Sequence, residues 1–459
     1  MNHQEFRDAI CNRKPRYNTK FKSLIERISS KGDVTGKGDF STFGAFYQTF
    51  MYAYIIGLRL GEKEYLKPCD EKMEFAPLSH WKPTPIRDFI LITLFNRSEK
   101  AYLLLEDGTI FEGMHFGVNG TVIGEVVFTT GMTAYQETLT DPSYYGQLVT
   151  QTFPLIGNYG VNTADNESAK SYIKGYIVRE WCNTPSNFRM EGNINDFLME
   201  QNIVGIHNID TRCLTRKIRE VGVMNGAITT ENVYEKKEEL LEQVKNFKIQ
   251  NAVLSVTGTE IRTYQPEQKK YRVVLFDFGY KRNIRNELVK RGCEVVVVPA
   301  TTTAKEVAEL HPDGIMLSNG PGDPSENTTI IQNIREIAAL QIPIFGICLG
   351  HQLMALANGC RTEKLKYGHR GANQPVIDLK SGRTYVTSQN HGYAVVGESI
   401  QPEIGEVSHI NANDHTCEGI RYKTINAFTV QFHPEAHGGP LDTAYLFDEF
   451  IAGMEKEKN

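Results

Sequence analysis

The 459-residue sequence shows neither the pattern expected of a signal peptide nor that expected of a membrane span. Its N-terminus lacks the order of basic, apolar and small residues that forms a signal peptide. The most apolar stretch, residues 43–58, is interrupted by Gln48 and Thr49 and is too short and mixed to span a bilayer. We therefore expect a cytoplasmic protein with no membrane partner.

The sequence also lacks cysteine motifs that bind metals and an overall positive charge. The eight cysteines include no C-x-x-C pair, and none has a histidine at zinc-finger spacing, which argues against a structural metal and predicts reduced thiols. The formal net charge is −5, so no basic field points to nucleic acid. Because a G-x-x-x-x-G-K phosphate loop is absent as well, we expect no metal and no other cofactor in this chain.

What the sequence does contain is enough apolar material for two or three domains, with 40% hydrophobic and 23% charged residues. In residues 1–95, apolar side chains recur at helical spacing, and Thr84-Pro85 is a helix-start signal. These residues are predicted to form a small helical extension of unknown role. Residues 96–250 alternate short strands, turns and helices, which predicts a mixed α/β domain. Residues 251–270 lack strong periodicity and are predicted to be a linker.

Residues 271–459 follow a different pattern, in which apolar strands alternate with helices. This order predicts an α/β fold with a mostly parallel sheet and helices on both faces. Ligands bind such sheets at the carboxyl ends of the strands. The loops richest in reactive side chains all follow predicted strands, so we expect them to meet at one edge.

Cys348 is the candidate nucleophile. It lies in Gly346-Ile347-Cys348-Leu349-Gly350, directly after a predicted strand and before a predicted helix. This is the spacing of a nucleophile elbow with cysteine in place of serine, and the glycines are expected to permit the sharp turn. The positive end of the helix dipole is expected to favour the thiolate. The alternative is a buried cysteine that happens to lie between glycines.

His433 is the candidate base, in Gln431-Phe432-His433-Pro434-Glu435 at the end of another predicted strand. Glu435 is placed to accept the second ring N–H and fix the tautomer. His391 is the rival base, but it has no acidic neighbour in sequence, and its loop is expected to hold substrate. The loop after residue 317 is the candidate oxyanion site, with the amides of Gly322 and Leu349 as donors.

Together these motifs resemble the class I glutamine amidotransferases over residues 271–455. In that family a cysteine attacks the glutamine side-chain amide, and a glutamyl thioester and ammonia are formed. Residues 125–144, 156–158, 209–216, 277–283 and 366–373 further resemble the small subunits of carbamoyl phosphate synthetases. The resemblance implies glutamine contacts at Gly320, Gly322, Leu349, Gln352, Asn390, Gly392 and Tyr393. At position 131, where some members place a serine, this chain has Gly131, so a contact there must come from the backbone.

The resemblance also implies a partner. A large synthetase subunit would bind ATP, magnesium and bicarbonate, receive the ammonia and make carbamoyl phosphate for arginine and pyrimidine biosynthesis, so a hetero-oligomer is expected. Two other interpretations remain. One is the glutaminase of another synthase, such as those for anthranilate, GMP or CTP. The other is a binding module with an inactive amidotransferase fold, which would predict loss of Cys348, His433 or Glu435, yet all three are present.

Overall fold

The computed structural model of the protein describes residues 16–18, 72–74 and 100–458, and the chain divides into two compact units, Met1–Lys100 and Ala101–Asn459. In the first unit, β1 (Arg16–Asn18) pairs with β2 (Lys72–Glu74) in antiparallel fashion. Neither strand was predicted. The helices expected within residues 1–95 lie outside the described residues. Among those described, no helix is long and apolar enough to cross a membrane.

The second unit begins with a closed β-barrel, which the sequence did not reveal. Its seven strands, in spatial order, are β10 (Val204–His207), β4 (Ile110–Gly117), β3 (Lys100–Leu105), β11 (Met224–Thr229), β5 (Thr121–Thr129), β6 (Gln147–Gln151) and β8 (Gly175–Ile177). Four helices of this domain are α5 (Tyr135–Thr140), α6 (Ile194–Glu200), α7 (Thr211–Val221) and α8 (Lys237–Asn246). The predicted mixed α/β character of this region is confirmed.

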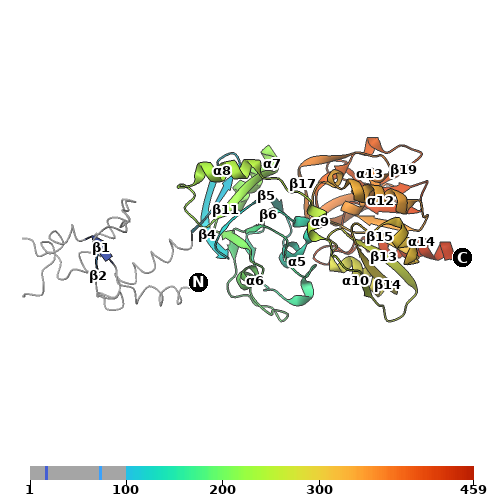
Figure 1. Ribbon diagram of the computed structural model, residues 1–459, viewed down its shortest axis with the longest axis horizontal. Coiled ribbons are helices and arrows are strands. Elements are labelled where there is room, and N and C mark those ends of the chain that lie inside the picture. The colour runs from blue at the N-terminus through green and yellow to red at the C-terminus, as the bar shows by residue number, and fades with distance from the viewer. Residues whose placement is uncertain (1–15, 19–71, 75–99, 459) are drawn as a thin grey trace, which may run out of the picture. The chain divides into compact units, whose positions relative to one another are not determined.

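A ten-stranded sheet follows (Figure 1), and its spatial order places the predicted motifs side by side. Its parallel half contains β14 (Cys293–Pro299), β13 (Tyr271–Asp277), β15 (Gly314–Leu317), β16 (Ile344–Ile347) and β21 (Ala427–Val430), in that order. The antiparallel half, which was not predicted, continues with β20 (Cys417–Tyr422), β18 (Thr384–Val395), β17 (Thr362–Asp378) and β19 (Gly405–Asn411).

The stretch expected to be an irregular linker is structured. It contains the short helix α9 (Ala252–Val256) and the strand β12 (Arg262–Tyr264), which pairs with β14 in antiparallel fashion at the edge of the sheet. Pairing with β14 satisfies the main-chain hydrogen-bonding groups of β12. Because this edge strand contains no long apolar run, hydrophobic periodicity did not predict it.

Helices cover both faces of the sheet, as predicted. Alternate residues of β13 enter two separate cores: Val274 and Phe276 pack on one face, Val273 and Leu275 on the other. The first core is closed by α11 (Ala304–Glu309), α12 (Thr328–Ala338) and α13 (Leu349–Ala357), the second by α10 (Arg282–Lys290) and α14 (Tyr445–Lys458). Because both faces are buried, the parallel strands are almost continuously apolar.

Candidate active site

The nucleophile elbow forms where β16 ends and α13 begins. Cys348 is the N-cap of α13 and has φ 52° and ψ −102°, a conformation that residues with a Cβ rarely adopt. Its N–H donates to the carbonyl of Val430 on β21 at 2.8 Å, and its thiol donates to the carbonyl of Asn390 at 3.7 Å. The sharp strand-to-helix turn predicted from the sequence is therefore present, with the strain on the cysteine itself.

The flanking glycines serve close packing, not the unusual backbone angle. A Cβ on Gly350 would overlap the carbonyl oxygen of Leu317 on β15, and one on Gly346 would lie 2.8 Å from the side chain of Thr429. Neither glycine is among the residues with positive φ. The absence of a Cβ thus allows the elbow to pack directly against the two neighbouring strands.

We expect Gly350→Ala to lower the free energy of unfolding by roughly 3 kcal/mol, because the added methyl group must displace backbone. Gly453→Ala is the matched control: nothing lies within 4 Å of its added Cβ. In helix α14 that change should stabilise by about 0.5–1 kcal/mol through helix propensity. Urea unfolding of both variants measures the difference, and equal stabilities would contradict the close-packing role.

His433 follows β21, beside the elbow, and is held by a buried carboxylate. Its Nδ1 lies 2.7 Å from Oε1 of Glu435, and the same oxygen lies 3.1 Å from Nζ of Lys281. Nε2 of His433 is buried and has no hydrogen-bond partner. With Nδ1–H donated to Glu435, Nε2 carries the free lone pair that a general base needs.

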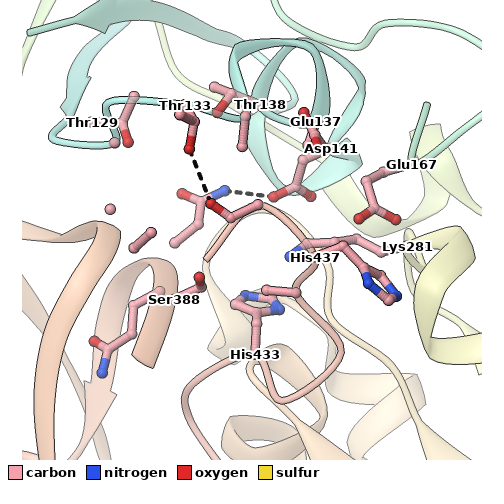
Figure 2. Close-up of a pocket in the computed structure, with 18 of the residues that line it drawn as sticks. Thr129, Thr133, Glu137, Thr138, Asp141, Glu167, Lys281, Ser388, His433 and His437 are labelled. Carbon is pink, nitrogen blue, oxygen red and sulfur yellow. Dashed lines mark hydrogen bonds between the residues drawn. The ribbon is translucent and has the colours of Figure 1, made fainter. Parts of the chain in front are cut away.

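Lys281, in the loop after β13, connects the domain of the ten-stranded sheet to the barrel domain. Figure 2 shows its side chain between His433 and two barrel-domain carboxylates, Asp141 and Glu167. Burial opposes the charge on Lys281, but Glu435, Asp141 and Glu167 outweigh it and raise the pKa of the ammonium. Burial likewise opposes ionisation of Glu435, but Lys281 and His433 outweigh it and lower its pKa to about 2. Glu435 is therefore ionised at neutral pH and can accept a hydrogen bond from Nδ1 of His433.

The thiol itself is not activated at rest. Burial, reinforced by the charge of Asp141, raises the pKa of Cys348 to about 12. The helix dipole was expected to favour the thiolate, but burial has the larger effect on the pKa of Cys348, because removal from water disfavours the charged thiolate more strongly than one helix end favours it. A base would have to remove this proton, and the predicted base, His433, follows β21, the strand that pairs with β16.

The candidate oxyanion loop, residues 318–324, packs tightly on the elbow. A Cβ on Gly320 would overlap the carbonyl oxygen of Phe278 and lie 2.7 Å from Leu349. Leu349 is the first residue of α13, so its N–H has no carbonyl partner within the helix. Asn319 donates to Oγ of Ser143 in the barrel domain at 2.9 Å, which fixes the loop from the other side.

A cavity of about 300 Å³ opens at Cys348 and is large enough for an amino acid. Six of the predicted glutamine contacts line it, namely Gly320, Gly322, Gln352, Asn390, Gly392 and Tyr393. Gln352 is fixed by donating to the carbonyl of Tyr393 at 2.7 Å and to Oε1 of Gln431 at 2.9 Å. His391 also lines this cavity, but it lies in the strand β18 and not in a loop as expected; its contact with substrate stays a prediction.

Gly131 lies elsewhere. It lines a second cavity of about 80 Å³, together with His433, Lys281 and the carboxyl groups of Glu137, Asp141 and Glu167 (Figure 2). Burial raises the pKa of Glu137 and of Glu167 to about 7. Asn390 lines both cavities, and its side chain donates to Asp141 at 3.0 Å.

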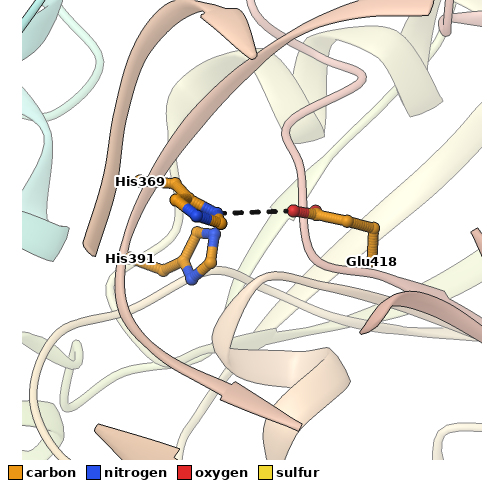
Figure 3. A group of neighbouring side chains, drawn as sticks. All are labelled: His369, His391 and Glu418. Carbon is orange, nitrogen blue, oxygen red and sulfur yellow. Dashed lines mark ion pairs between the residues drawn. The ribbon is translucent and has the colours of Figure 1, made fainter. Parts of the chain in front are cut away.

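One group of side chains in residues 100–458 is close enough to share a metal ion: His369, His391 and Glu418, with donor atoms within 4.8 Å of one another (Figure 3). Three of the four ring nitrogens are hydrogen-bonded, and the fourth, Nδ1 of His369, lies 3.5 Å from Glu418. His391 bonds to the carbonyl of Tyr393 at 2.7 Å, and Nε2 of His369 lies 2.8 Å from Asp414. The group is therefore explained as an ion-pair network that supports β18. The expected absence of a metal stays a prediction.

This network predicts a pH-dependent stability. Burial disfavours the charge on His369, but hydrogen bonds and Coulomb attraction from Asp414 and Glu418 outweigh it and raise the pKa of His369 to about 9. Because the folded pKa exceeds the unfolded one, the stabilisation is complete below about pH 6.5 and is lost as pH rises through 9.

We therefore expect wild type to exceed His369→Gln in stability by about 1–3 kcal/mol at pH 6.5 and by much less at pH 10. His415→Gln, at an exposed histidine of the adjoining turn, should retain the wild-type pH dependence. Unfolding in urea across this pH range measures both. A constant difference between wild type and His369→Gln would contradict the ion-pair assignment.

Sequence reasoning missed three residues at this site: Lys281, Asp141 and Glu167. Lys281 and Asp141 lie within motifs quoted for the family resemblance, so a signal was present, but no role followed from it. Glu167 lies outside those motifs. Its main-chain carbonyl accepts from the N–H of Arg282, and its carboxylate accepts from Asn283 at 2.9 Å, contacts that no local pattern reveals.

The comparisons with known proteins agree with both halves of this unit. The class I glutamine amidotransferase family model matches residues 274–452, and the model of the carbamoyl-phosphate synthase small chain, CPSase domain, matches residues 103–228. The chain is 52% identical over 359 residues to a carbamoyl phosphate synthase small chain of Bacillus cereus, covering 78% of this chain and 97% of that one. It is 51% identical over 364 residues to the small chain of Fusobacterium nucleatum, covering 79% of this chain and 99% of that one. It is 49% identical over 364 residues to the small chain of Staphylococcus epidermidis, covering 78% of this chain and 98% of that one. This chain therefore belongs to the carbamoyl phosphate synthase small chain family and carries a class I glutamine amidotransferase domain.

Proposed function

We propose that this chain is the glutaminase subunit of a glutamine-dependent carbamoyl phosphate synthetase. It would hydrolyse L-glutamine to glutamate through a thioester on Cys348 and deliver ammonia to a large synthetase subunit. One observation carries the chemistry: the strained Cys348 elbow lies beside a histidine whose Nδ1 is fixed by Glu435 and whose buried Nε2 has no partner. A buried unpaired nitrogen costs free energy, which favours a role for it in proton transfer.

In the first half-reaction His433 would remove the thiol proton as the sulfur of Cys348 attacks the glutamine side-chain carbonyl. The proton moves to Nε2, an S–C bond forms, and the carbonyl oxygen gains negative charge. The N–H groups of Gly322 and Leu349 are the proposed donors to that oxygen. Because burial raises the pKa of the Cys348 thiol to about 12, proton transfer to His433 would accompany the attack of the sulfur.

Collapse of this intermediate would break the C–N bond, and Nε2 would return its proton to the departing nitrogen to release ammonia. Water, deprotonated by the same nitrogen, would then attack the thioester and release glutamate. The carboxylate of Glu435 would stabilise the His433 imidazolium in both halves, and Lys281 would keep Glu435 ionised and in place. Lys281 is thus a positioning residue.

We further propose that ammonia leaves through the second cavity, on the His433 side of Asn390. Its volume of about 80 Å³ suits a molecule the size of water. Ammonia released into bulk water at neutral pH would be mostly protonated and lost as a nucleophile. The acceptor would be a large subunit that binds ATP, magnesium and bicarbonate, so that the working enzyme is a cytoplasmic hetero-oligomer serving arginine and pyrimidine biosynthesis.

An inactive binding module is the second candidate, but the site argues against it. A module without chemistry has no need for a strained cysteine or for a buried lysine–glutamate–histidine chain. The glutaminases of other synthases are disfavoured by the family match of the barrel domain.

The test combines this chain with a carbamoyl phosphate synthase large subunit and measures carbamoyl phosphate formed from glutamine or from ammonium. Addition of this chain should confer glutamine-dependent synthesis on a large subunit that otherwise uses only ammonium. Glutamine hydrolysis without any gain in carbamoyl phosphate would show a different acceptor, and no hydrolysis at all would refute the proposed chemistry.

A further inference from the structure

Arg370 is a buried cation that the mechanism above does not use. It lies on β17, opposite Asn390 of β18, and is 5% exposed. Its guanidinium has five N–H donors. One of its nitrogens, Nη1, donates to the carbonyl of Tyr367 at 2.7 Å, while Nε is buried without a partner. A desolvated charge with unused donors is costly, which points to a ligand that pairs with it.

The guanidinium faces the cavity of Cys348. Arg370 lines that cavity beside Asn390, His391 and Gly392. A Cβ on Gly392 would lie 3.2 Å from Nη2, and one on Gly368 would overlap Nη1. Glycines on both strands therefore leave room for the guanidinium against the segment predicted to contact glutamine.

The other charges around this cavity suit a zwitterionic amino acid. Lys364, a second cation of the lining, is neutralised by Glu125 at 2.7 Å. Asp323 and Glu326 also line the cavity and carry the negative charge that an α-ammonium group requires. Lys248, the third cation of this lining, is exposed. Arg370 is buried and is attracted by the charge of Glu125 without forming an ion pair with it, so its planar guanidinium is available to match a carboxylate through two parallel hydrogen bonds.

The backbone of Arg370 also holds the loop that contains Gly131. Its carbonyl accepts from the main-chain N–H of Thr130 and from Oγ1 of Thr130, each at 3.2 Å. At position 131 this chain offers no side chain to the substrate, and Gly131 lies in the lining of the other cavity. The side chain of Arg370, the residue that anchors this loop, can supply a substrate contact that Gly131 has no side chain to make.

We propose that Arg370 binds the α-carboxylate of L-glutamine and thereby determines which amides this site accepts. The inference rests on the proposed glutaminase function and adds to it a specificity residue. The group recognised is the carboxylate, so the preferred substrate class is α-amino acids with a side-chain amide, and their α-carboxamide counterparts are bound more weakly.

The experiment uses the complex with a large subunit and compares wild type, Arg370→Gln and Arg370→Lys. Glutamate or ammonia release is measured with L-glutamine and with L-glutaminamide, which has a carboxamide in place of the α-carboxylate. For Arg370→Gln, KM for L-glutamine should rise roughly 10- to 150-fold, the loss expected for a charge-assisted hydrogen bond, with kcat little changed. KM for L-glutaminamide should stay the same, and Arg370→Lys should be intermediate.

Arg421→Gln is the matched control, because Arg421 pairs with Glu449 at 2.5 Å and lines neither cavity. It should leave both KM values unchanged. Equal increases in KM for both substrates would overturn the inference and assign Arg370 to packing. A fall in kcat at constant KM would overturn it in favour of an effect on the thiol, and unchanged kinetics would overturn it outright.

Failure of the proposed chemistry is separable from failure of this inference. Binding of L-glutamine and of L-glutaminamide to the complex is also measured by calorimetry in a Cys348→Ser background, where no turnover is needed. If wild type shows no hydrolysis, a preference for L-glutamine that disappears in Arg370→Gln still supports carboxylate recognition. Equal binding of the two ligands in both proteins refutes it.

Discussion

Replacing Cys348 with serine is expected to lower glutamine-dependent carbamoyl phosphate synthesis at least about 10³-fold while ammonium-dependent synthesis by the complex continues at the wild-type rate. Serine keeps the shape of the elbow but is a far weaker nucleophile than a thiol whose proton His433 can accept. Carbamoyl phosphate is measured with each nitrogen donor at saturating ATP and bicarbonate.

The control for this substitution is Cys213→Ser, at an exposed cysteine of α7 in the barrel domain. It should leave both activities unchanged. Loss of ammonium-dependent synthesis in Cys348→Ser would mean that the cysteine supports the complex structurally. Retention of glutamine-dependent synthesis would remove Cys348 from the mechanism.

The second large effect is expected for Lys281→Met, which should lower the free energy of unfolding by about 3–5 kcal/mol at pH 7. Lys281 is 8% exposed, and its charge offsets those of Glu435, Asp141 and Glu167. Without it, buried carboxylates face one another unpaired. Glutaminase activity should fall too, because the pKa of Glu435 rises and His433 loses its orientation. Urea unfolding and glutamate release measure the two effects.

The pH dependence separates this mechanism from simple loss of packing. The Glu435 pKa is held low in the folded state, so its stabilisation is present above the unfolded value near 4.5 and is lost as pH falls toward 2. The destabilisation by Lys281→Met should therefore shrink in acid. Lys423→Met, at a half-exposed pair with Glu406, should cost less than about 1 kcal/mol at any pH. A pH-independent loss in Lys281→Met would indicate packing alone.

Local patterns of apolar residues predicted much of the fold because they indicate which side chains of a strand or helix are buried. The strand predicted before Cys348 is β16, and the strand predicted before His433 is β21, which ends three residues earlier. The helix expected after the elbow is α13. The antiparallel half of the sheet was not predicted. Its longest strand, β17, mixes buried and exposed residues without regular alternation and has two register shifts against β18. Periodicity cannot report such a strand.

The candidate site also contains residues that local patterns predicted and residues that they did not. Cys348, His433 and Glu435 were identified because each follows a strand, and the carboxyl ends of parallel strands meet at one edge. Lys281 and Arg370 were not assigned roles. The burial and the surroundings of Lys281 depend on Asp141 in another domain, and those of Arg370 depend on Gly392 in another strand; both are distant in sequence.

By itself, the sequence determined the reactive groups and their order along strands, since elbow spacing and strand ends are local properties of the chain. The tertiary structure alone decided their protonation and pairing. It buried the Cys348 thiol and raised its pKa, placed Lys281 among carboxylates from two domains, and left Arg370 facing a cavity with unused donors. The physical reason is that desolvation and Coulomb interactions depend on distances through space, and these exist only once the barrel and the sheet have packed together.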